Sequence, residues 1–336
     1  MVPNDNYWMK NPVGPGKGDQ LPYIDDFRIL IIPDLSTRLA ALRTGTVDRM
    51  GGLNEEDRGQ VQNLELKELA YTSLHGRGSP MLMRIDRAPF DDIRVRRAMN
   101  LVIDNQAMLD GLYGGVGQIN TYPASKINPY ETLYLDLDAP DFPEAARELY
   151  EYHPDKAKEL LAEAGYPDGF KIEILLTTTQ VDYYSIVKDY LSKVGIELVL
   201  DVRDGGVIST MHQKKEHAAI AITTTGPIAQ FTSGFTFQGV SRYNLAMVDD
   251  PVINQAMAEM KLVALTDQFK AMEMFREMTK YIVQQAYAIP NVIGPRYIYW
   301  WPWLRAYSGE NAVGYDDYNW QQWIWIDQEM KKSRGF

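Results

Sequence analysis

Cysteine is absent from the 336-residue sequence, and histidine is scarce, with four residues. The first absence excludes disulfides, thiol nucleophiles and zinc–thiolate sites, and it leaves the redox compartment open. No continuous apolar run approaches the roughly 18 residues that a membrane-spanning helix requires. The sequence therefore points away from thiol chemistry and from a helix that crosses a membrane.

Basic residues are too few for nucleic-acid binding. Lys and Arg total 34 against 45 Asp and Glu, which gives a net charge of −11 with neutral histidine. An acidic chain repels phosphate backbones, and no compact Lys/Arg block offsets this repulsion. The remaining composition is that of a globular protein, and the length predicts roughly two domains.

The first residues lack a secretion signal. Residues 1–5 have neither the basic segment nor the apolar segment of a signal peptide, and the chain opens almost directly on Asn6–Tyr7–Trp8. Either the gene product is cytosolic or an upstream segment has been removed.

Strand and helix patterns alternate between residues 171 and 223. Apolar runs predict strands at Lys171–Leu176, Ile196–Val202 and Ala218–Thr223, and 3.6-residue periodicity predicts helices at Val181–Val194 and Ser209–Lys215. This order predicts an α/β protein with a mostly parallel sheet and helices on both faces.

The rest of the chain holds less regular patterns. We expect linkers near 86–90 and 288–296, where the α/β periodicity breaks, and an irregular segment over 114–152. Six of the seven tryptophans lie between residues 300 and 325, where we expect them to close a core. Further predicted elements are strands at Phe27–Ile32, Glu65–Leu74 and Pro80–Ile85. Predicted helices are Ser36–Arg43, Asp91 or Asp92 to Val102, Lys156–Ala164, Pro251–Leu265, and Thr266 or Asp267 to about Ala286.

Metal and cofactor chemistry finds little support. His212 and His217 are five residues apart, which does not place both on one helical face, and no third ligand lies nearby in the sequence. We therefore interpret them as surface histidines. Gly114–Gly117 lacks the spacing of a phosphate-binding loop and is interpreted as a flexible loop. No cofactor and no metal are predicted.

One enzyme alternative stays open. Ser185 and Lys188 match the S-x-x-K pattern of serine acyl-enzymes, whose chemistry needs a nucleophile beside a base. The accompanying S-D-N and K-T-G elements are absent, and both residues lie within an amphipathic helix. No catalytic residue is therefore predicted, and a solvated helical turn is the favoured interpretation.

Several ordered segments resemble family 5 extracellular solute-binding proteins, the peptide- and oligosaccharide-capturing receptors of ATP-binding-cassette importers. The first three are similar to the N-x-x-Y-W, P-Y-L-D and L-x-S-G-E-I-D motifs of that family. The matching segments are Asn6–Trp8, Leu21–Asp25, Leu42–Asp48, Ala88–Ala98, Ile103–Asp104, Tyr152–Gly165, Tyr166–Phe170 and Leu191–Ile196.

The resemblance implies a periplasmic-binding-protein-like class II fold and a binding function without catalysis. It assigns 1–87 and 291–336 to an incomplete lobe I and 88–290 to lobe II. Family members are longer at the N-terminus, so the resemblance favours a removed segment holding a secretion signal and often a lipid anchor. It implies a periplasmic or extracellular, membrane-associated protein that delivers its solute to permease subunits. The missing part of lobe I would leave apolar surface exposed, which favours dimerisation.

By resemblance, the ligand contacts of lobe II come from the loops after its first and third strands. Strand-end loops of an open parallel sheet are also where physical reasoning places a ligand. Their hydroxyl and amide groups suit neutral polar partners. The predicted ligand-binding residues are Thr178, Thr179, Gln180, Tyr183, Thr223, Thr224, Thr225, Gly226 and Gln230.

One departure from the family pattern bears on the ligand. Peptide-binding members carry a W-x-x-D-Y-like segment whose Asp pairs with the free amino group of the peptide. The aligned stretch 223–228 has neither Trp nor an acid, and a buried ammonium without a counter-charge is costly. A neutral ligand such as an oligosaccharide therefore gains ground over a peptide with a free N-terminus. A signalling or interaction module on the same fold is a further alternative.

Overall fold

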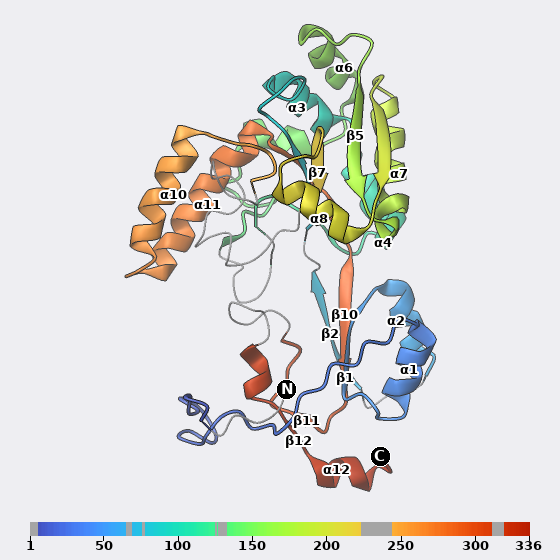
Figure 1. Cartoon of the computed structure of the whole chain (residues 1–336), viewed down its shortest axis with the longest axis vertical. Coiled ribbons are helices and arrows are strands. Elements are labelled where there is room, and N and C mark those ends of the chain that lie inside the picture. The colour runs from blue at the N-terminus through green and yellow to red at the C-terminus, as the bar shows by residue number, and fades with distance from the viewer. Residues whose placement is uncertain are drawn as a thin grey trace. The chain divides into compact units, whose positions relative to one another are not determined.

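A computed structural model describes residues 6–64, 69–75, 78–124, 126, 133–222, 244–310 and 319–336. The chain divides into two compact units. Unit 1 comprises Met1–Gly76 and Pro295–Phe336, and unit 2 comprises Arg77–Gly294 (Figure 1).

Unit 2 is built on a five-stranded sheet in the order β6-β5-β7-β3-β8. Strand β5 runs parallel to β6 and β7, whereas β3 runs antiparallel to β7 and β8. The predicted α/β class is confirmed, and the sheet is mixed because β3 and β8 join its far edge. The strand bounds are β3 Met81–Met83, β5 Lys171–Leu176, β6 Glu197–Val202, β7 Ile220–Ile222 and β8 Ala288–Ile289.

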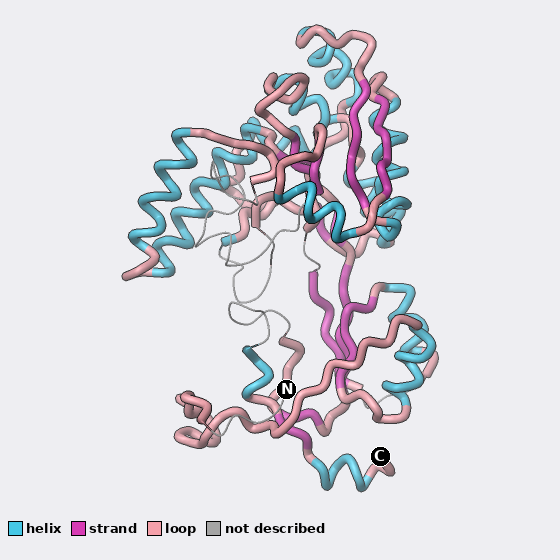
Figure 2. The backbone as a smooth tube through the Cα atoms, viewed as in Figure 1, coloured by secondary structure: helices cyan, strands magenta, loops and turns pink. Residues whose placement is uncertain are grey.

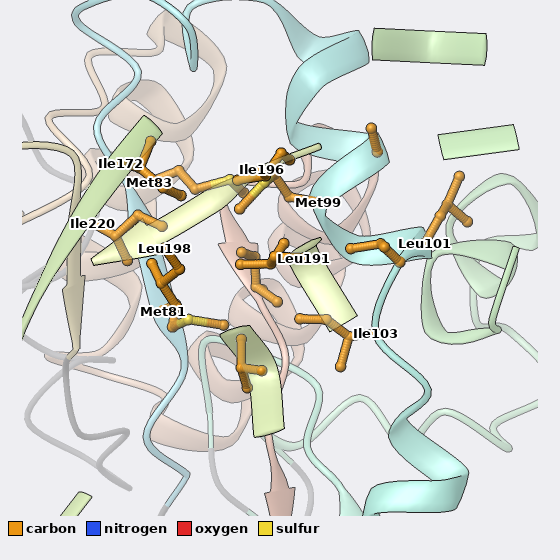
Figure 3. Packing of buried hydrophobic residues seen from close by; sticks show 14 of the residues in the cluster. Met81, Met83, Met99, Leu101, Ile103, Ile172, Leu191, Ile196, Leu198 and Ile220 are labelled. Atoms are coloured by element: carbon orange, nitrogen blue, oxygen red, sulfur yellow. The ribbon is translucent and has the colours of Figure 1, made fainter. Parts of the chain in front are cut away.

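Helices cover both faces of this sheet, because successive side chains of a strand point to opposite sides. Met81 and Met83 of β3 belong to the first core, which Figure 3 shows, while Leu82 between them belongs to a second core. The first core includes residues of α3 (Ile93–Leu101), α6 (Pro154–Glu163) and α7 (Val181–Ser192). The second includes residues of α10 (Pro251–Val263) and α11 (Gln268–Gln285).

The helix starts follow from short polar side chains. Asp92 caps α3 by accepting from the Arg94 amide, and Asp267 caps α11 by accepting from the Lys270 amide. Both helices were predicted to begin near these residues. The other elements of unit 2 are α4 Asn105–Tyr113, α5 Glu144–Arg147, α8 Gly205–Gln213, the 3₁₀ turns η2 Glu148–Tyr150 and η3 Thr178–Gln180, and the paired strands β4 Gln118–Ile119 and β9 Val292–Ile293.

Unit 1 carries a three-stranded antiparallel sheet in the order β1-β10-β2. Its core contains Trp301 and Trp303, and a neighbouring cluster contains Trp300 and Trp320, so the prediction that the tail closes a core holds for these four. Trp325 is exposed. The elements of unit 1 are α1 Leu35–Arg43, β1 Arg49–Leu53, α2 Glu55–Gln62, β2 Ala70–His75, β10 Pro295–Trp300, β11 Leu304–Arg305, η4 Asn319–Gln322, β12 Trp325–Ile326 and α12 Gln328–Ser333.

One expectation about unit 1 needs correction, and its boundary differs from the expected linker. The predicted strand at Phe27–Ile32 is a loop in Figure 2, with Ile29 and Ile31 exposed at 67% and 89%. Its apolar run fits a strand, but among the described residues no strand pairs with it. The first unit boundary lies between residues 76 and 77, before the linker expected near 86–90, because β3 pairs with β7 and β8 of unit 2.

Candidate functional site

The candidate site lies at the carboxyl ends of β5 and β6. These strands end level with each other, since Leu176 is paired with Val202 in the parallel ladder. The Arg203 amide then donates to the Leu176 carbonyl oxygen at 3.0 Å. This register places the turn after β5 beside the start of α8. The Thr177 methyl group would lie 3.9 Å from a Cβ built on Gly205.

The turn after β5, Thr177–Gln180, is held by its own side chains. The Gln180 Oε1 accepts from the Thr177 amide at 2.9 Å and from the Thr177 hydroxyl at 3.0 Å. This reciprocal capping box fixes the turn before the first residue of α7. Because Oε1 is occupied, the Gln180 group left for a ligand is the Nε2 donor. The side chains of Thr178 and Thr179 are exposed on the same turn.

Charge at this edge is locally compensated. The Arg203 guanidinium pairs with Asp201 at 2.7 Å, and Asp204 caps α8 by accepting from the Gly206 amide at 2.8 Å. The described edge therefore presents hydroxyl and amide groups beside an ion pair and a capped helix. Such groups recognise neutral polar atoms of a ligand through hydrogen bonds.

Tyr183 is engaged within unit 2. Its hydroxyl oxygen accepts from the Val292 amide at 3.2 Å, and burial raises the pKa of this phenol. The next residue, Tyr184, is 3% exposed and donates to the Ser79 carbonyl oxygen at 3.2 Å. Sequence reasoning missed Tyr184, Ser79 and Val292, because these contacts join residues more than 100 positions apart.

The other predicted contacts cannot be placed. Thr223, Thr224, Thr225, Gly226 and Gln230 lie outside the described residues. The structure thus gathers Thr178, Thr179 and Gln180 on one turn, with Tyr183 one helical turn further along. Their predicted role as ligand contacts stays a prediction.

The S-x-x-K pair shows no nucleophile–base contact. The Ser185 hydroxyl donates to the Val181 carbonyl oxygen at 2.8 Å, within its own helix α7. An acyl-enzyme needs this hydroxyl directed at a general base. Lys188 is exposed on the same helix. The geometry is that of a solvated helical turn.

The two neighbouring histidines are not on the surface, which corrects our expectation. His217 is fully buried and His212 half-buried, and their ring centres lie 5.3 Å apart at an interplanar angle of 80°. The two residues meet because α8 ends and the chain reverses through Lys215, whose φ is +59°. Among the described residues, no group of three or more His, Asp or Glu side chains could hold a metal ion.

Protonation of His217 should make folding pH-dependent. Burial, and to a smaller extent the nearby His212, Arg84 and Lys215, lower the pKa of His217 from 6.5 to about 4, against the hydrogen bond to the Leu245 carbonyl oxygen, which raises it. Between these values the unfolded chain binds the proton and the folded chain does not, so stability falls as the pH drops from about 6.5 towards 4. We expect wild type to lose about 1–2 kcal/mol of unfolding free energy between pH 7 and pH 5 through this group.

Urea unfolding of wild type and His217→Gln at both pH values measures this loss. The glutamine keeps a donor near the Leu245 carbonyl oxygen, which His217 Nε2 contacts at 2.9 Å. The partly exposed His153 provides the control substitution, His153→Gln. If wild type and His217→Gln lost equal stability on acidification, the buried neutral imidazole would not be the cause.

Comparison with known proteins identifies the family. A family model described as bacterial extracellular solute-binding proteins, family 5 Middle, matches residues 1–241. The chain belongs to this family. Within the described residues, the helices are all too short or too polar to cross a membrane.

Two curated relatives match the chain in part. Heme-binding protein A of Haemophilus influenzae is 35% identical over 180 residues, which cover 51% of this chain and 27% of that protein. The glutathione-binding protein GsiB of Salmonella choleraesuis is 28% identical over 190 residues, covering 55% of this chain and 34% of that protein. The matched stretch therefore spans about a third or less of the length of these relatives.

Solved structures share the fold over nearly the whole chain. HbpA2 from Haemophilus parasuis aligns with 97% of this chain and 61% of its own, with a TM-score of 0.68 and 20% identity. The periplasmic binding protein DppA from Helicobacter pylori, solved with the peptide STSA, aligns with 97% and 60%, with a TM-score of 0.69 and 23% identity. The periplasmic-binding-protein fold is thus confirmed.

Proposed function

We propose that this chain is part of an extracellular solute-binding receptor of an ATP-binding-cassette importer, which captures an oligopeptide or oligosaccharide and presents it to a permease. Family membership supports the receptor role. The names of similar proteins support small solutes of varied chemistry, since they describe binding of heme, of glutathione and of a peptide.

The observation that carries the proposal is the turn Thr177–Gln180. It lies where ligands bind in open α/β sheets, at the carboxyl end of a parallel strand. It is fixed by its own capping box, so a ligand would not have to order it. Thr178 and Thr179 offer exposed hydroxyl groups, and Gln180 offers an amide donor.

The same features favour a non-enzymatic role. Relatives are named as binding proteins, and Ser185 donates its hydroxyl proton to the backbone of its own helix. We also propose a periplasmic or extracellular location, with membrane attachment in the complete protein, because the family is extracellular. Dimerisation of the chain stays a prediction.

Removing the polar groups of this turn should weaken ligand binding. We expect the double variant Thr178→Val/Thr179→Val to bind its best ligand about tenfold or more weakly, because each lost hydrogen bond costs about 0.5–1.5 kcal/mol. Native mass spectrometry and calorimetry would test wild type against glutathione, haemin, tetrapeptides and neutral oligosaccharides. Thr266→Val, at an exposed threonine of the α10–α11 turn, is the matched control.

The pattern of ligands decides between classes. Retention of an oligosaccharide but no peptide would support the neutral-ligand reading drawn from stretch 223–228. Equal affinities for wild type and the double variant would remove Thr178 and Thr179 from the site. A wild type that holds no member of the panel would contradict solute capture by this chain.

A further inference from the structure

Unit 2 is joined to unit 1 by two segments of chain. The chain enters unit 2 at Arg77 and leaves it at Gly294. We call Gly78–Pro80 the entry segment and Asn291–Gly294 the exit segment. Any movement of unit 2 relative to unit 1 must pass through these two connections.

The entry and exit segments are tied to each other inside unit 2. The Ser79 amide donates to Asn291 Oδ1 at 3.0 Å, across 212 positions of sequence. The Asn291 side chain is 8% exposed, so water competes little for this bond. Asn291 is further held through its carbonyl oxygen, which accepts from the Asn120 amide at 3.0 Å. The two segments therefore share one part-buried hydrogen-bond network.

Two adjacent tyrosines of helix α7 form hydrogen bonds with the two segments, one with each. Tyr184 donates its hydroxyl to the Ser79 carbonyl oxygen of the entry segment at 3.2 Å. Tyr183 accepts from the Val292 amide of the exit segment, also at 3.2 Å. Their ring centres are 5.1 Å apart at 72°, an edge-to-face contact that supports both orientations. Each segment thus has its own anchor on the first turn of one helix.

The exit segment has little room to shift. A Cβ on Gly294 would lie 2.4 Å from the Tyr113 ring, so Tyr113 packs directly on this backbone. A Cβ on Gly117 would lie 2.2 Å from the Ile293 carbonyl oxygen. Strand β9 is also paired with β4 along this segment. Close packing on several sides makes the exit segment part of the body of unit 2.

We propose that Tyr183 and Tyr184 are positioning residues that lock the entry and exit segments to the start of α7, and so to the turn Thr177–Gln180. This role rests on the proposed function, since it matters for a receptor whose two parts close on a solute. Gln180 lies one helical turn before Tyr184, and its side chain belongs to the capping box. The Thr177–Gln180 turn and both connecting segments then move as one body.

Hydrogen exchange tests the lock without any ligand. In Tyr183→Phe the Val292 amide loses its acceptor and should exchange about five- to tenfold faster. The Ser79 amide has no bond to Tyr183, so its faster exchange in the same variant would show that the two segments open together. The control is Tyr190→Phe on α7, whose ring packs on Tyr152. Unchanged Ser79 exchange in Tyr183→Phe would overturn the lock.

A distance measurement tests the consequence for the two units. The cysteine-free chain accepts a spin-label pair at Glu56→Cys and Lys158→Cys, both exposed. We expect Tyr183→Phe/Tyr184→Phe to broaden the distance distribution. Val187→Ala, which removes buried volume from α7, should lower stability without broadening it.

The outcomes separate the lock from general destabilisation and from ligand binding. Equal broadening in Val187→Ala, or no broadening in the double variant, would overturn the proposal. Both experiments use the free protein, so a failure to find a ligand would bear on the proposed function alone.

Discussion

Replacing Trp303 by alanine is expected to lower the free energy of unfolding of unit 1 by about 3–5 kcal/mol. Trp303 is fully buried and stacks on Trp301, with ring centres 4.5 Å apart at 8°. Its indole N–H donates to Asp48 Oδ1 at 2.7 Å, and Lys331 donates to the same oxygen at 2.7 Å. The substitution therefore creates a cavity and removes one of two donors from a carboxylate.

Tryptophan fluorescence measures this loss of stability for unit 1 alone. All seven tryptophans lie in residues 1–76 or 295–336, so the fluorescence transition in urea follows unit 1 alone. Trp325→Ala is the matched control, because Trp325 is 43% exposed and should cost within about 0.5 kcal/mol. Similar shifts for both variants would mean that Trp303 is not central to this core.

Hydrophobic periodicity predicted the bounds of an element where a helix forms its own backbone hydrogen bonds, or where a strand pairs with a strand that is close in the sequence. The predicted strand Lys171–Leu176 matches β5 residue for residue, and the predicted helix from Val181 begins at that residue in α7. Strand β6 follows α7 after a short turn, and it pairs with β5 over its whole length. In this segment the local pattern and the tertiary contacts agree, as minimally frustrated sequences require.

Prediction failed where the partner is distant. The run Phe27–Ile32 has the composition of a strand, but hydrogen-bond pairing and not composition makes a strand. Strand β3 is only three residues long, and its antiparallel partners β7 and β8 follow more than 130 residues later. No local signal in the sequence assigns β3 to unit 2, so the unit boundary at 76/77 could not be read from the linker pattern.

The candidate site was predictable in part. The strand-end rule and the family resemblance placed Thr178, Thr179 and Gln180 on one turn, and the structure brings them together there. The capping box of this turn corresponds to the Thr-x-x-Gln spacing of 177–180, which is a local sequence signal for a helix start. The contacts of Tyr183 and Tyr184 with Val292 and Ser79 could not be read, because no sequence pattern links these pairs.

Replacing Gly169 by alanine should destabilise unit 2 by about 3 kcal/mol or more, through strain in the backbone. Its φ is +76°, and an added Cβ would lie 2.1 Å from the Gly195 carbonyl oxygen. Gly195 also has a positive φ, +81°, and its own Cβ would lie 2.7 Å from the Asp168 carbonyl oxygen. The two turns thus meet backbone to backbone, directly before β5 and β6 begin their parallel pairing at Lys171 and Glu197.

Gly165→Ala separates the conformational cost from the contact. Gly165 has a similar φ of +92°, but nothing lies within 4 Å of its added Cβ. Gly165→Ala should lower the free energy of unfolding by only about 1–2 kcal/mol, which is the cost of a non-glycine residue in the left-handed conformation. Urea unfolding followed by far-UV circular dichroism would compare the two variants.

A clearly larger loss of stability for Gly169→Ala means that the close approach of the two turns sets the β5–β6 register, and with it the position of the Thr177–Gln180 turn. Equal losses would mean that the backbone relaxes around the methyl group and that the register is set by the strands themselves.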